Sequence, residues 1–442
     1  MVNIIIHRGL EQIGGCITEI STATSRVFID LGKNLPGNGE ATTPEQDKYM
    51  VETLFQNNQK EHTAVIYTHV HDDHIGLFDY VPDGIQQMVG EGAKEIILEK
   101  YRLLCEADKL AGNDPETNQR KYAKLKVFKT WPRSTKPVAF SVGDIRITPY
   151  YNCHSIYDSY MFLIEADGKR IWHMGDYRQH GWMGGKLLKL LKWQATDIDV
   201  LITEGTMLSR DDECIHESVV AEKMAHVMQA FKYVFVLVSA TDIERLASIN
   251  LAAKEAHKPL CVCSGYINST MRIFTDRESK RPGDLFDFKH RYYFKHRYYD
   301  EKKPIEPILK RGFVMCAGVS QLERVDKLRS QLPEEETLLI YSTWDGYYKD
   351  AAQVEQNPEY KKFRETFHNV VDIYTSGHAS RQTIKEVIET VNPKEAIVGI
   401  HKDEGQTLET LGLSEQFNKK ILSTFDKTFN QSGKYNQIIN ND

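Results

Sequence analysis

The clearest feature of the hydropathy pattern is a short apolar run that ends abruptly in polar side chains. Residues 63–67 are β-branched, apolar or aromatic, and they predict a buried strand. Three histidines and two aspartates then follow within six positions, from His69 to His74. If a helix begins near Asp73, these side chains share one tight loop at the carboxyl end of a strand. Open α/β sheets usually place their sites there.

Further short apolar runs predict strands along the rest of the chain. The opening is β-rich, with runs at 3–7, 16–20 and 26–31, and a hairpin is expected around Asp167 and Gly168. The other expected strands are 145–151, 198–203, 233–238, 260–263, 312–316, 337–341 and 396–400, and the expected helices include 217–231, 242–256 and 382–391. This later alternation predicts a second, parallel sheet and a second α/β domain that begins shortly after Thr206.

The 69–74 loop carries the ligand types of a borderline metal. His69, His71, Asp73 and His74 offer nitrogen and oxygen donors that suit zinc, and also manganese or iron. A solvated polar turn is the alternative, but it requires three histidines to gather by chance. We therefore interpret the loop as a metal site, and a second metal could share it.

Several other polar residues follow predicted strands and are candidates for the same site. His154 follows the strand at 145–151, as a further ligand would, although a lone histidine is more often structural. Asp176 comes after a glycine at a strand end, where its carboxylate could lie between two cations. Asp30 is either a turn former or a residue that supports the metal loop through hydrogen bonds, and the histidine loop favours the second reading. His378 and His401 also follow strands.

Composition limits the class of protein. The chain has 442 residues, a net charge of −6 and 41% apolar residues, which is typical of a globular protein of two to three domains. No apolar run approaches the roughly 18 residues that span a bilayer, and the amino terminus lacks a secretory pattern. Seven cysteines without a Cys-x-x-Cys pair indicate reduced thiols and a cytoplasmic location. Cys261 and Cys263 are expected to pack in the core.

One hexapeptide is repeated directly, at 288–293 and 294–299. Its basic and aromatic residues alternate in a way that suits single-stranded nucleic acid, with cations for phosphates and rings for bases. A duplicated, solvated surface segment explains the pattern equally well, and the sequence leaves both readings open. Because the whole chain is acidic, any nucleic acid must be bound by local basic patches.

The pattern His-x-His-x-Asp-His resembles the signature of the metallo-β-lactamase superfamily, and the later motifs resemble its β-CASP branch, closest to the ribonuclease J group. The resemblance rests on Asp30, the 69–74 loop, His154, Asp176, Glu204 with Thr206, the segment 376–380 and His401. It implies a metallo-β-lactamase αββα sandwich, residues 1–206 and 373–442, interrupted by a β-CASP α/β domain with a mainly parallel sheet at 207–372.

The resemblance also implies roles for these residues. His69, His71 and His154 would hold one divalent metal, and Asp73, His74 and His401 would hold the other, with Asp176 bridging the two. Zinc is expected, with manganese as the alternative. Glu204 would steer His378, which would protonate the leaving 3′-oxygen or stabilise the oxyanion. Ser376, Gly377 and Ser380 would hold a phosphate.

The implied function is a metal-dependent phosphodiesterase that cleaves single-stranded RNA as an endonuclease, a 5′-exonuclease or both, with DNA also open as substrate. The chain departs from the ribonuclease J pattern at Tyr374, where the group has histidine, and at 239–245, which keeps only Arg245. The C-terminal domain that helps many members of the group to oligomerise is expected to be absent, which leaves the oligomeric state open, a homodimer included. Two alternatives remain: a hydrolase of a small ester, lactone or thioester, and an RNA-binding scaffold without catalysis.

Overall fold

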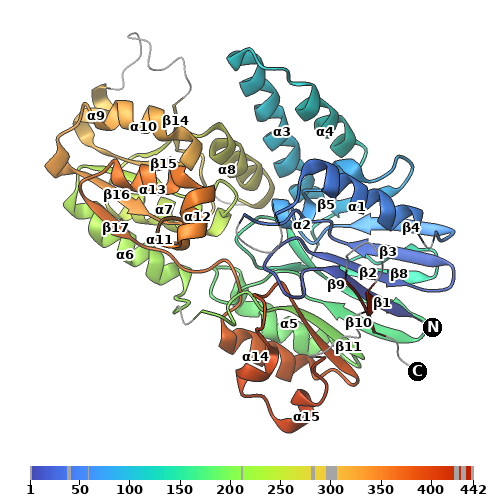
Figure 1. The fold of residues 1–442 in the computed structure, drawn as a ribbon. Coiled ribbons are helices and arrows are strands. Elements are labelled where there is room, and N and C mark those ends of the chain that lie inside the picture. Colours follow the sequence, from blue (N-terminus) through green and yellow to red (C-terminus); the bar gives the residue numbers. More distant parts are fainter. Residues whose placement is uncertain are drawn as a thin grey trace.

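Figure 1 shows the fold in a computed structural model, which contains three β-sheets. The structure describes residues 2–36, 41–57, 59–134, 136–210, 213–279, 284–294 and 306–422, and the strands 428–429 and 435–439. Two of the sheets belong to the part of the chain before residue 205 and after residue 395. The third is formed only by strands between residues 233 and 372.

The first two sheets face each other as a sandwich. The eight-stranded sheet has the order β19-β20-β1-β2-β3-β4-β5-β6, and the six-stranded sheet has the order β18-β11-β10-β9-β8-β7. Their strands are β1 (Asn3–Arg8), β2 (Ile17–Ser21), β3 (Ser25–Ile29), β4 (His62–Ile66), β5 (Gln86–Gly90), β6 (Lys129–Trp131), β7 (Phe140–Val142), β8 (Ile145–Asn152), β9 (Ser159–Ala166), β10 (Lys169–His173), β11 (Val200–Glu204), β18 (Ala396–Ile400), β19 (Thr428–Phe429) and β20 (Tyr435–Ile439).

The core between these two sheets is made by the inward-facing side chains of both. Val27 and Ile66 from the first sheet belong to the same buried cluster as Ile147, Phe162 and Val200 from the second. Helices cover the two outer faces: α1 (Pro44–Gln56) and α3 (Glu91–Ala111) lie over the first sheet, and α5 (Leu187–Gln194) and α14 (Arg381–Val391) over the second. The result is the four-layer αββα arrangement that the sequence predicts.

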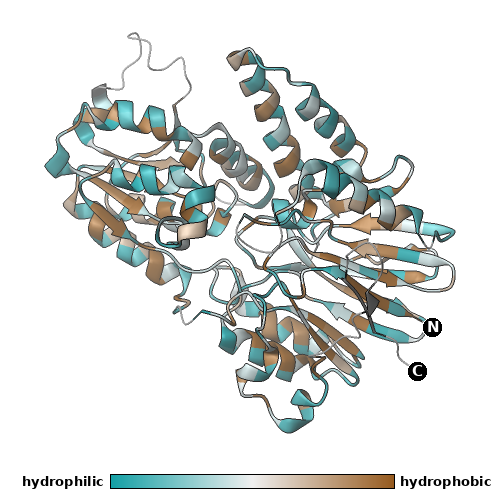
Figure 2. Ribbon diagram, viewed as in Figure 1, coloured by the Kyte–Doolittle hydropathy of each residue, from teal (hydrophilic) through white to brown (hydrophobic). Residues whose placement is uncertain are grey.

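The third sheet is entirely parallel, with the order β14-β13-β15-β12-β16-β17. Its strands are β12 (Tyr233–Leu237), β13 (Leu260–Val262), β14 (Tyr292–Tyr293), β15 (Phe313–Ala317), β16 (Thr337–Tyr341) and β17 (Val370–Asp372), and its main helices are α6 (Glu217–Ala230), α7 (Ile243–Glu255), α8 (Gly265–Glu278), α10 (Leu322–Arg329) and α13 (Pro358–Glu365). Helices cover both faces, so β12 is buried along its whole length and reads as a continuous apolar run. In Figure 2 the strands of this sheet are mostly hydrophobic, whereas hydrophobic and hydrophilic residues alternate along the helices.

The fold class that the sequence predicts is confirmed. The 167–168 hairpin forms between β9 and β10, and the helical stretch after residue 90 breaks at 112–115 into α3 and α4 (Glu116–Lys126). Cys261 and Cys263 lie in the core of the third sheet, and no disulfide joins any of the seven cysteines, all of which lie in the described ranges. In the part of the chain that the structure describes, no helix combines the length and the apolarity that crossing a bilayer requires.

Candidate metal centre

The metal loop is held against the neighbouring strand by Asp30. Strand β4 ends at Ile66 and the short helix α2 (Asp72–Ile75) begins six residues later, so the histidines lie at the carboxyl end of the strand. The Asp30 carboxylate accepts hydrogen bonds from the Thr68 amide (2.7 Å) and hydroxyl (2.8 Å) and lies 2.8 Å from Nδ1 of His74. Asp30 adopts a left-handed backbone with φ of 62°. The support role expected for Asp30 therefore has a direct structural basis.

Three imidazole nitrogens converge in a first donor set. Nδ1 of His71 lies 3.0 Å from Nε2 of His69 and 3.2 Å from Nε2 of His154. The outer nitrogens are occupied: Nδ1 of His69 lies 3.0 Å from the Thr68 hydroxyl, and Nδ1 of His154 donates to the carbonyl of Gly377 at 2.7 Å. Such outer contacts orient the rings and leave the inner nitrogens free to bind a cation.

A second donor set lies directly beside the first. Nε2 of His401 is 3.1 Å from Oδ2 of Asp73, and Nε2 of His74 is 3.1 Å from Oδ2 of Asp176. The outer nitrogen of His401 lies 2.7 Å from the Thr206 hydroxyl, and its amide donates to the carbonyl of Gly9. His401 also has a left-handed backbone, with φ of 53°. Residues more than three hundred positions apart therefore meet in one buried cluster.

Asp176 lies between the two sets. The atom Oδ2 that is near His74 is also 3.7 Å from Nε2 of His401 and 3.8 Å from Nε2 of His154. The residue follows β10 and Gly175, which has φ of 57° and would bring a Cβ within 2.9 Å of the carbonyl of Tyr160. A glycine at 175 thus lets the chain turn tightly and direct the carboxylate between the two histidine groups.

The charge states of these residues suit divalent cations. Burial lowers the pKa of His71 to about 4 and moves the pKa values of His69 and His154 well below their usual value, so these rings are neutral. Burial acts to raise the pKa of Asp73 and Asp176, but the neighbouring histidines outweigh it and the pKa of each carboxylate falls. Neutral imidazoles and ionised carboxylates are the forms that bind metals.

Two geometric observations test whether metals fit. Ligand atoms about 2.0 to 2.1 Å from a tetrahedral zinc lie roughly 3.3 Å from one another, and the neighbouring donor atoms here are 3.0 to 3.8 Å apart. Nε2 of His74 is buried and, although Oδ2 of Asp176 lies 3.1 Å away, it makes no hydrogen bond of good geometry in the described structure. An unpaired buried polar atom is costly unless something else satisfies it. The residues present therefore fit a pair of divalent ions.

Glu204 and His378 form a pair at the edge of the cluster. Strand β11 ends at Glu204, whose Oε2 lies 2.9 Å from Nδ1 of His378 and whose Oε1 accepts the amides of Tyr177 and Ala379. Burial acts to lower the pKa of His378, but the Glu204 charge outweighs it and the pKa is raised. The His378 side chain is 22% exposed and so remains accessible from solvent. His378 is thus an accessible imidazole with a raised pKa beside the proposed metal ligands.

A fully buried group of charges lies behind the cluster, and we call it the arginine core: Arg178, Arg245, Glu217, Asp242 and Glu244. Arg178, two residues after Asp176, contacts all three carboxylates and donates to the carbonyl of Ser376. Arg245 chelates Glu217 at 2.9 to 3.1 Å.

The arginine core also reaches the segment that carries His378. Arg245 donates to the carbonyl of Thr375 at 3.0 Å and to the Ser342 hydroxyl at 2.7 Å. The arginine core therefore joins the third sheet and its helices to the sandwich and to the His378 segment.

The three residues expected to hold a phosphate have local partners. The buried Ser376 hydroxyl accepts the amide of His378, and the Ser380 hydroxyl accepts the amide of Thr383 as the cap of α14. A Cβ at Gly377 would come within 2.3 Å of the Ser155 hydroxyl, so the segment needs glycine there. Their phosphate-binding role stays a prediction.

The first hexapeptide copy is partly built into the fold, since Phe288 is buried and Arg291 donates to the carbonyl of Asn268, while Lys289 and His290 are exposed. Of the second copy, 295–299 lie outside the described residues.

Sequence reasoning missed some residues of the site. It gave no role to Thr206, whose hydroxyl contacts both His401 and His378, and it did not single out Cys16, whose thiol lies with the His74 and His401 nitrogens inside 4.8 Å. For Thr206 the position two residues after Glu204 was a usable signal. For Cys16 the sequence offered none, because its nearness depends on packing between β2 and the loop.

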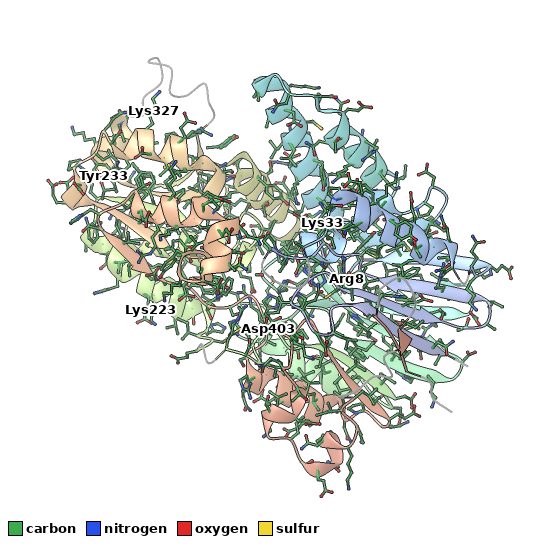
Figure 3. The ribbon with its side chains drawn as sticks, in the orientation of Figure 1. Arg8, Lys33, Lys223, Tyr233, Lys327 and Asp403 are labelled. Atoms are coloured by element: carbon green, nitrogen blue, oxygen red, sulfur yellow. The ribbon has the colours of Figure 1, made fainter. Side chains whose placement is uncertain are left out.

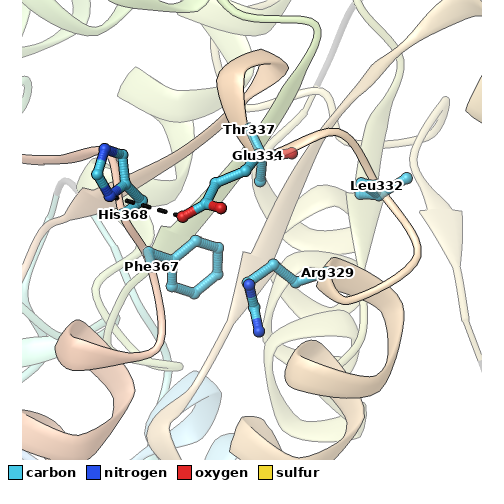
Figure 4. A pocket seen from close by; sticks show the side chains of 6 residues that line it. All are labelled: Arg329, Leu332, Glu334, Thr337, Phe367 and His368. Atoms are coloured by element: carbon cyan, nitrogen blue, oxygen red, sulfur yellow. Dashed lines mark ion pairs between the residues drawn. The ribbon is translucent and has the colours of Figure 1, made fainter.

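A small surface pocket lies at the other end of the third sheet. It is lined by Arg329, Leu332, Glu334, Thr337, Phe367 and His368, and Figure 4 shows the His368–Glu334 pair at its rim. Thr337 is the first residue of β16, whereas the arginine core contacts Ser342 just beyond the end of the same strand. The pocket is therefore separate from the metal centre.

No protein-family model matches the chain. Among curated proteins, it is 28% identical to ribonuclease J of Helicobacter pylori over 171 residues, which is 38% of this chain and 22% of that protein. It is 26% identical over 207 residues to the endoribonuclease YSH1 of Gibberella zeae, 45% of this chain and 23% of that protein. The matched part thus spans less than a quarter of either relative.

Among solved structures, the chain resembles a protein of unknown function from Enterococcus faecalis V583. The TM-score is 0.70 at 16% identity, over 99% of this chain and 100% of that one. This likeness concerns the fold. Together with the distant, partial similarity to ribonuclease J and YSH1, it agrees with a metallo-β-lactamase-like sandwich fold to which an all-parallel sheet is added, and the buried histidine and aspartate cluster is consistent with metal binding.

Proposed function

We propose that this protein is a metal-dependent phosphodiesterase that cleaves single-stranded RNA. The observation that carries the proposal is the pair of donor sets that share Asp176, with His378 and Glu204 beside them. His69, His71 and His154 would hold one ion, and Asp73, His74 and His401 the other. Zinc suits this mixture of imidazoles and carboxylates, with manganese as the alternative.

Two bound ions would supply hydroxide at neutral pH and offset the charge that develops on the phosphoryl oxygens. The chain's own residues do the rest. Glu204 accepts from Nδ1 of His378, which orients the ring and raises its pKa. His378 is then placed to donate a proton to the leaving 3′-oxygen. The Thr206 hydroxyl contacts Nδ1 of both His401 and His378 and so fixes the two rings relative to each other.

The choice of RNA rests on the distant relatives, which are named as ribonucleases. The second α/β unit agrees with a polymeric substrate, because a small substrate has no need of it. We propose that residues 1–206 and 373–442 form the catalytic domain and that 207–372 form an inserted β-CASP domain, which contains the third sheet and its helices (Figure 1). We also propose a cytoplasmic location, because none of the seven cysteines forms a disulfide.

A single experiment tests the function and its alternatives. The protein is loaded with zinc or manganese and offered end-labelled RNA with a 5′-monophosphate, 5′-triphosphate or 5′-hydroxyl, together with matched DNA and a small lactone. Mononucleotides from the monophosphate end support 5′-exonuclease action, and internal fragments support endonuclease action. Turnover of the lactone without cleavage of any polynucleotide would refute the proposal in favour of a small-ester hydrolase. Binding of RNA without metal or cleavage would indicate a scaffold.

A further inference from the structure

An arginine and a tryptophan from distant parts of the chain stack beside the metal centre. The guanidinium carbon of Arg210 lies 4.4 Å from the centre of the Trp344 ring. Gly346 lies against the same indole, because a Cβ there would come within 2.3 Å of a ring carbon. Both side chains are only partly exposed. The arrangement therefore holds the guanidinium in one plane and one place.

Short connections to the site keep this pair close to His378. Arg210 is four residues after Thr206, and two tight turns shorten the path, since Leu208 bonds back to Gly205 and Arg210 to Met207. The Thr206 hydroxyl itself lies 3.2 Å from Nδ1 of His378. Arg210 thus extends from the same short segment that positions the proposed acid.

Trp344 reaches the site from the third sheet. It follows Ser342, whose hydroxyl donates to the carbonyl of Ile373 at 2.7 Å, so the 342–347 segment runs beside the segment that leads to His378. Electrostatics agree with this placement. Burial and the Glu204 charge dominate the pKa of His378, and the positive charge of Arg210 then acts to lower it. Burial raises the pKa of Tyr374 to about 12, and Arg210 acts against this rise as well.

Among the described residues, no carboxylate pairs with Arg210. In the described ranges of the chain, no ion pair or side-chain hydrogen bond joins its guanidinium to another residue. Other arginines of the site are fully used: Arg178 and Arg245 belong to the arginine core, and Arg381 donates to two carbonyls. A held, partly buried and unpaired guanidinium has its N–H edge available for an anion, and its fork geometry matches two phosphate oxygens.

We propose that Arg210, supported by Trp344, binds a backbone phosphate of the substrate next to the one that is cleaved. This inference rests on the proposed nuclease function and adds a phosphate subsite to it. The subsite holds the strand equally before and during cleavage, so its loss should act mainly on KM, and kcat should change only through the smaller influence of the Arg210 charge on the pKa of His378. Because the contact is with the backbone, it should matter equally for every base sequence.

The test uses the full chain and a 3′-fluorescein-labelled single-stranded RNA. Cleavage with zinc or manganese gives kcat and KM, and fluorescence anisotropy in EDTA gives the Kd without cleavage, both over a range of KCl concentrations. Arg210→Gln should raise KM and Kd by roughly 10- to 100-fold and make the slope of log K against log salt shallower by about 0.7. Arg210→Lys should keep the salt slope but recover only part of the affinity.

Two further variants separate this role from a general structural one. Trp344→Leu removes the ring that supports the guanidinium and should raise KM and Kd less than Arg210→Gln does. Arg329→Gln removes the same charge at the pocket of Figure 4 and should leave KM, Kd and salt slope unchanged. If Arg210→Gln retains wild-type KM, Kd and salt slope while the wild type cleaves RNA, the subsite is wrong and the nuclease function stands. If the wild type neither cleaves nor binds any polynucleotide, both fall.

Discussion

Arg245 offers the sharpest test of how the arginine core holds the molecule together. Its guanidinium is fully buried, chelates Glu217 with contacts of 2.9 and 3.1 Å, and donates to the carbonyl of Thr375 at 3.0 Å. Arg245→Met removes the charge and keeps most of the volume. It leaves the Glu217 carboxylate with Arg178 at 3.2 Å as its remaining cationic partner. Removing one partner of a buried ion pair costs about 3 to 5 kcal/mol, because the other charge stays buried.

The assay is urea unfolding followed by far-ultraviolet circular dichroism. Arg364→Met is the matched control, because Arg364 pairs with Asp372 at 3.0 Å with both side chains about a third exposed. Such a surface pair contributes about 0 to 1 kcal/mol. The free energy of unfolding should therefore fall by several kcal/mol for Arg245→Met and by about 1 kcal/mol or less for the control. Equal losses in the two variants would refute the assignment.

A double variant checks the mechanism of that loss. Glu217→Gln in the Arg245→Met background removes the charge that Arg245→Met leaves uncompensated. The combined loss of stability should therefore be smaller than the sum of the two single losses, because the residues are in direct contact. Strict additivity would show that the cost of Arg245→Met comes from packing and not from the buried carboxylate. In either case the measurement needs no knowledge of the substrate.

Three further predictions concern acid stability and the metal centre. Burial acts to raise the pKa of Glu217, but Arg245 and Arg178 outweigh it and lower the pKa from its ordinary 4.5 to about 2. The extra stability of the wild type over Glu217→Gln should therefore be complete above about pH 5 and shrink as the pH falls towards 2. Urea unfolding midpoints measured across pH check this. Dialysis against EDTA should remove about two metal ions per chain and abolish cleavage, and His74→Ala should bind fewer ions by elemental analysis while its circular dichroism stays unchanged. His378→Ala should lower kcat by about 10²- to 10⁴-fold with full metal content; an unchanged kcat would remove His378 from the reaction.

The limits of several strands could be predicted from the sequence. Strands β16 and β18 begin and end where the apolar runs predict, because each is a continuous buried stretch bounded by polar residues. Helix α1 was not predicted, although Thr43 and Gln46 form a capping box at its N-terminus and Pro44 is its first residue. That signal was present and was overlooked.

The metal centre could be predicted where a short sequence motif contains several metal-binding residues. His69 to His74 lie within six positions, and the structure brings His154, Asp176 and His401 to them as the resemblance implies. The arginine core was not foreseen. Nothing local in Arg178 or Glu217 distinguishes a buried ion pair from a solvated one, since the pairing depends on how α6 and α7 pack behind the site. Arg210 and Trp344 were missed for the same reason, because 134 positions separate them.

Figure 3 shows Arg8, Lys33 and Asp403 in the middle of the molecule, where the sandwich and the third sheet's side of the chain approach each other. The arginine core ties these two parts together beside the segment that carries His378. Separating the two parts would expose five buried, paired charges to water, so we expect them to move as one rigid body. Under the proposed nuclease function, a rigid site would not open to admit a duplex. We then expect base-paired RNA to be cleaved only after local unpairing, at a rate set by the stability of the duplex.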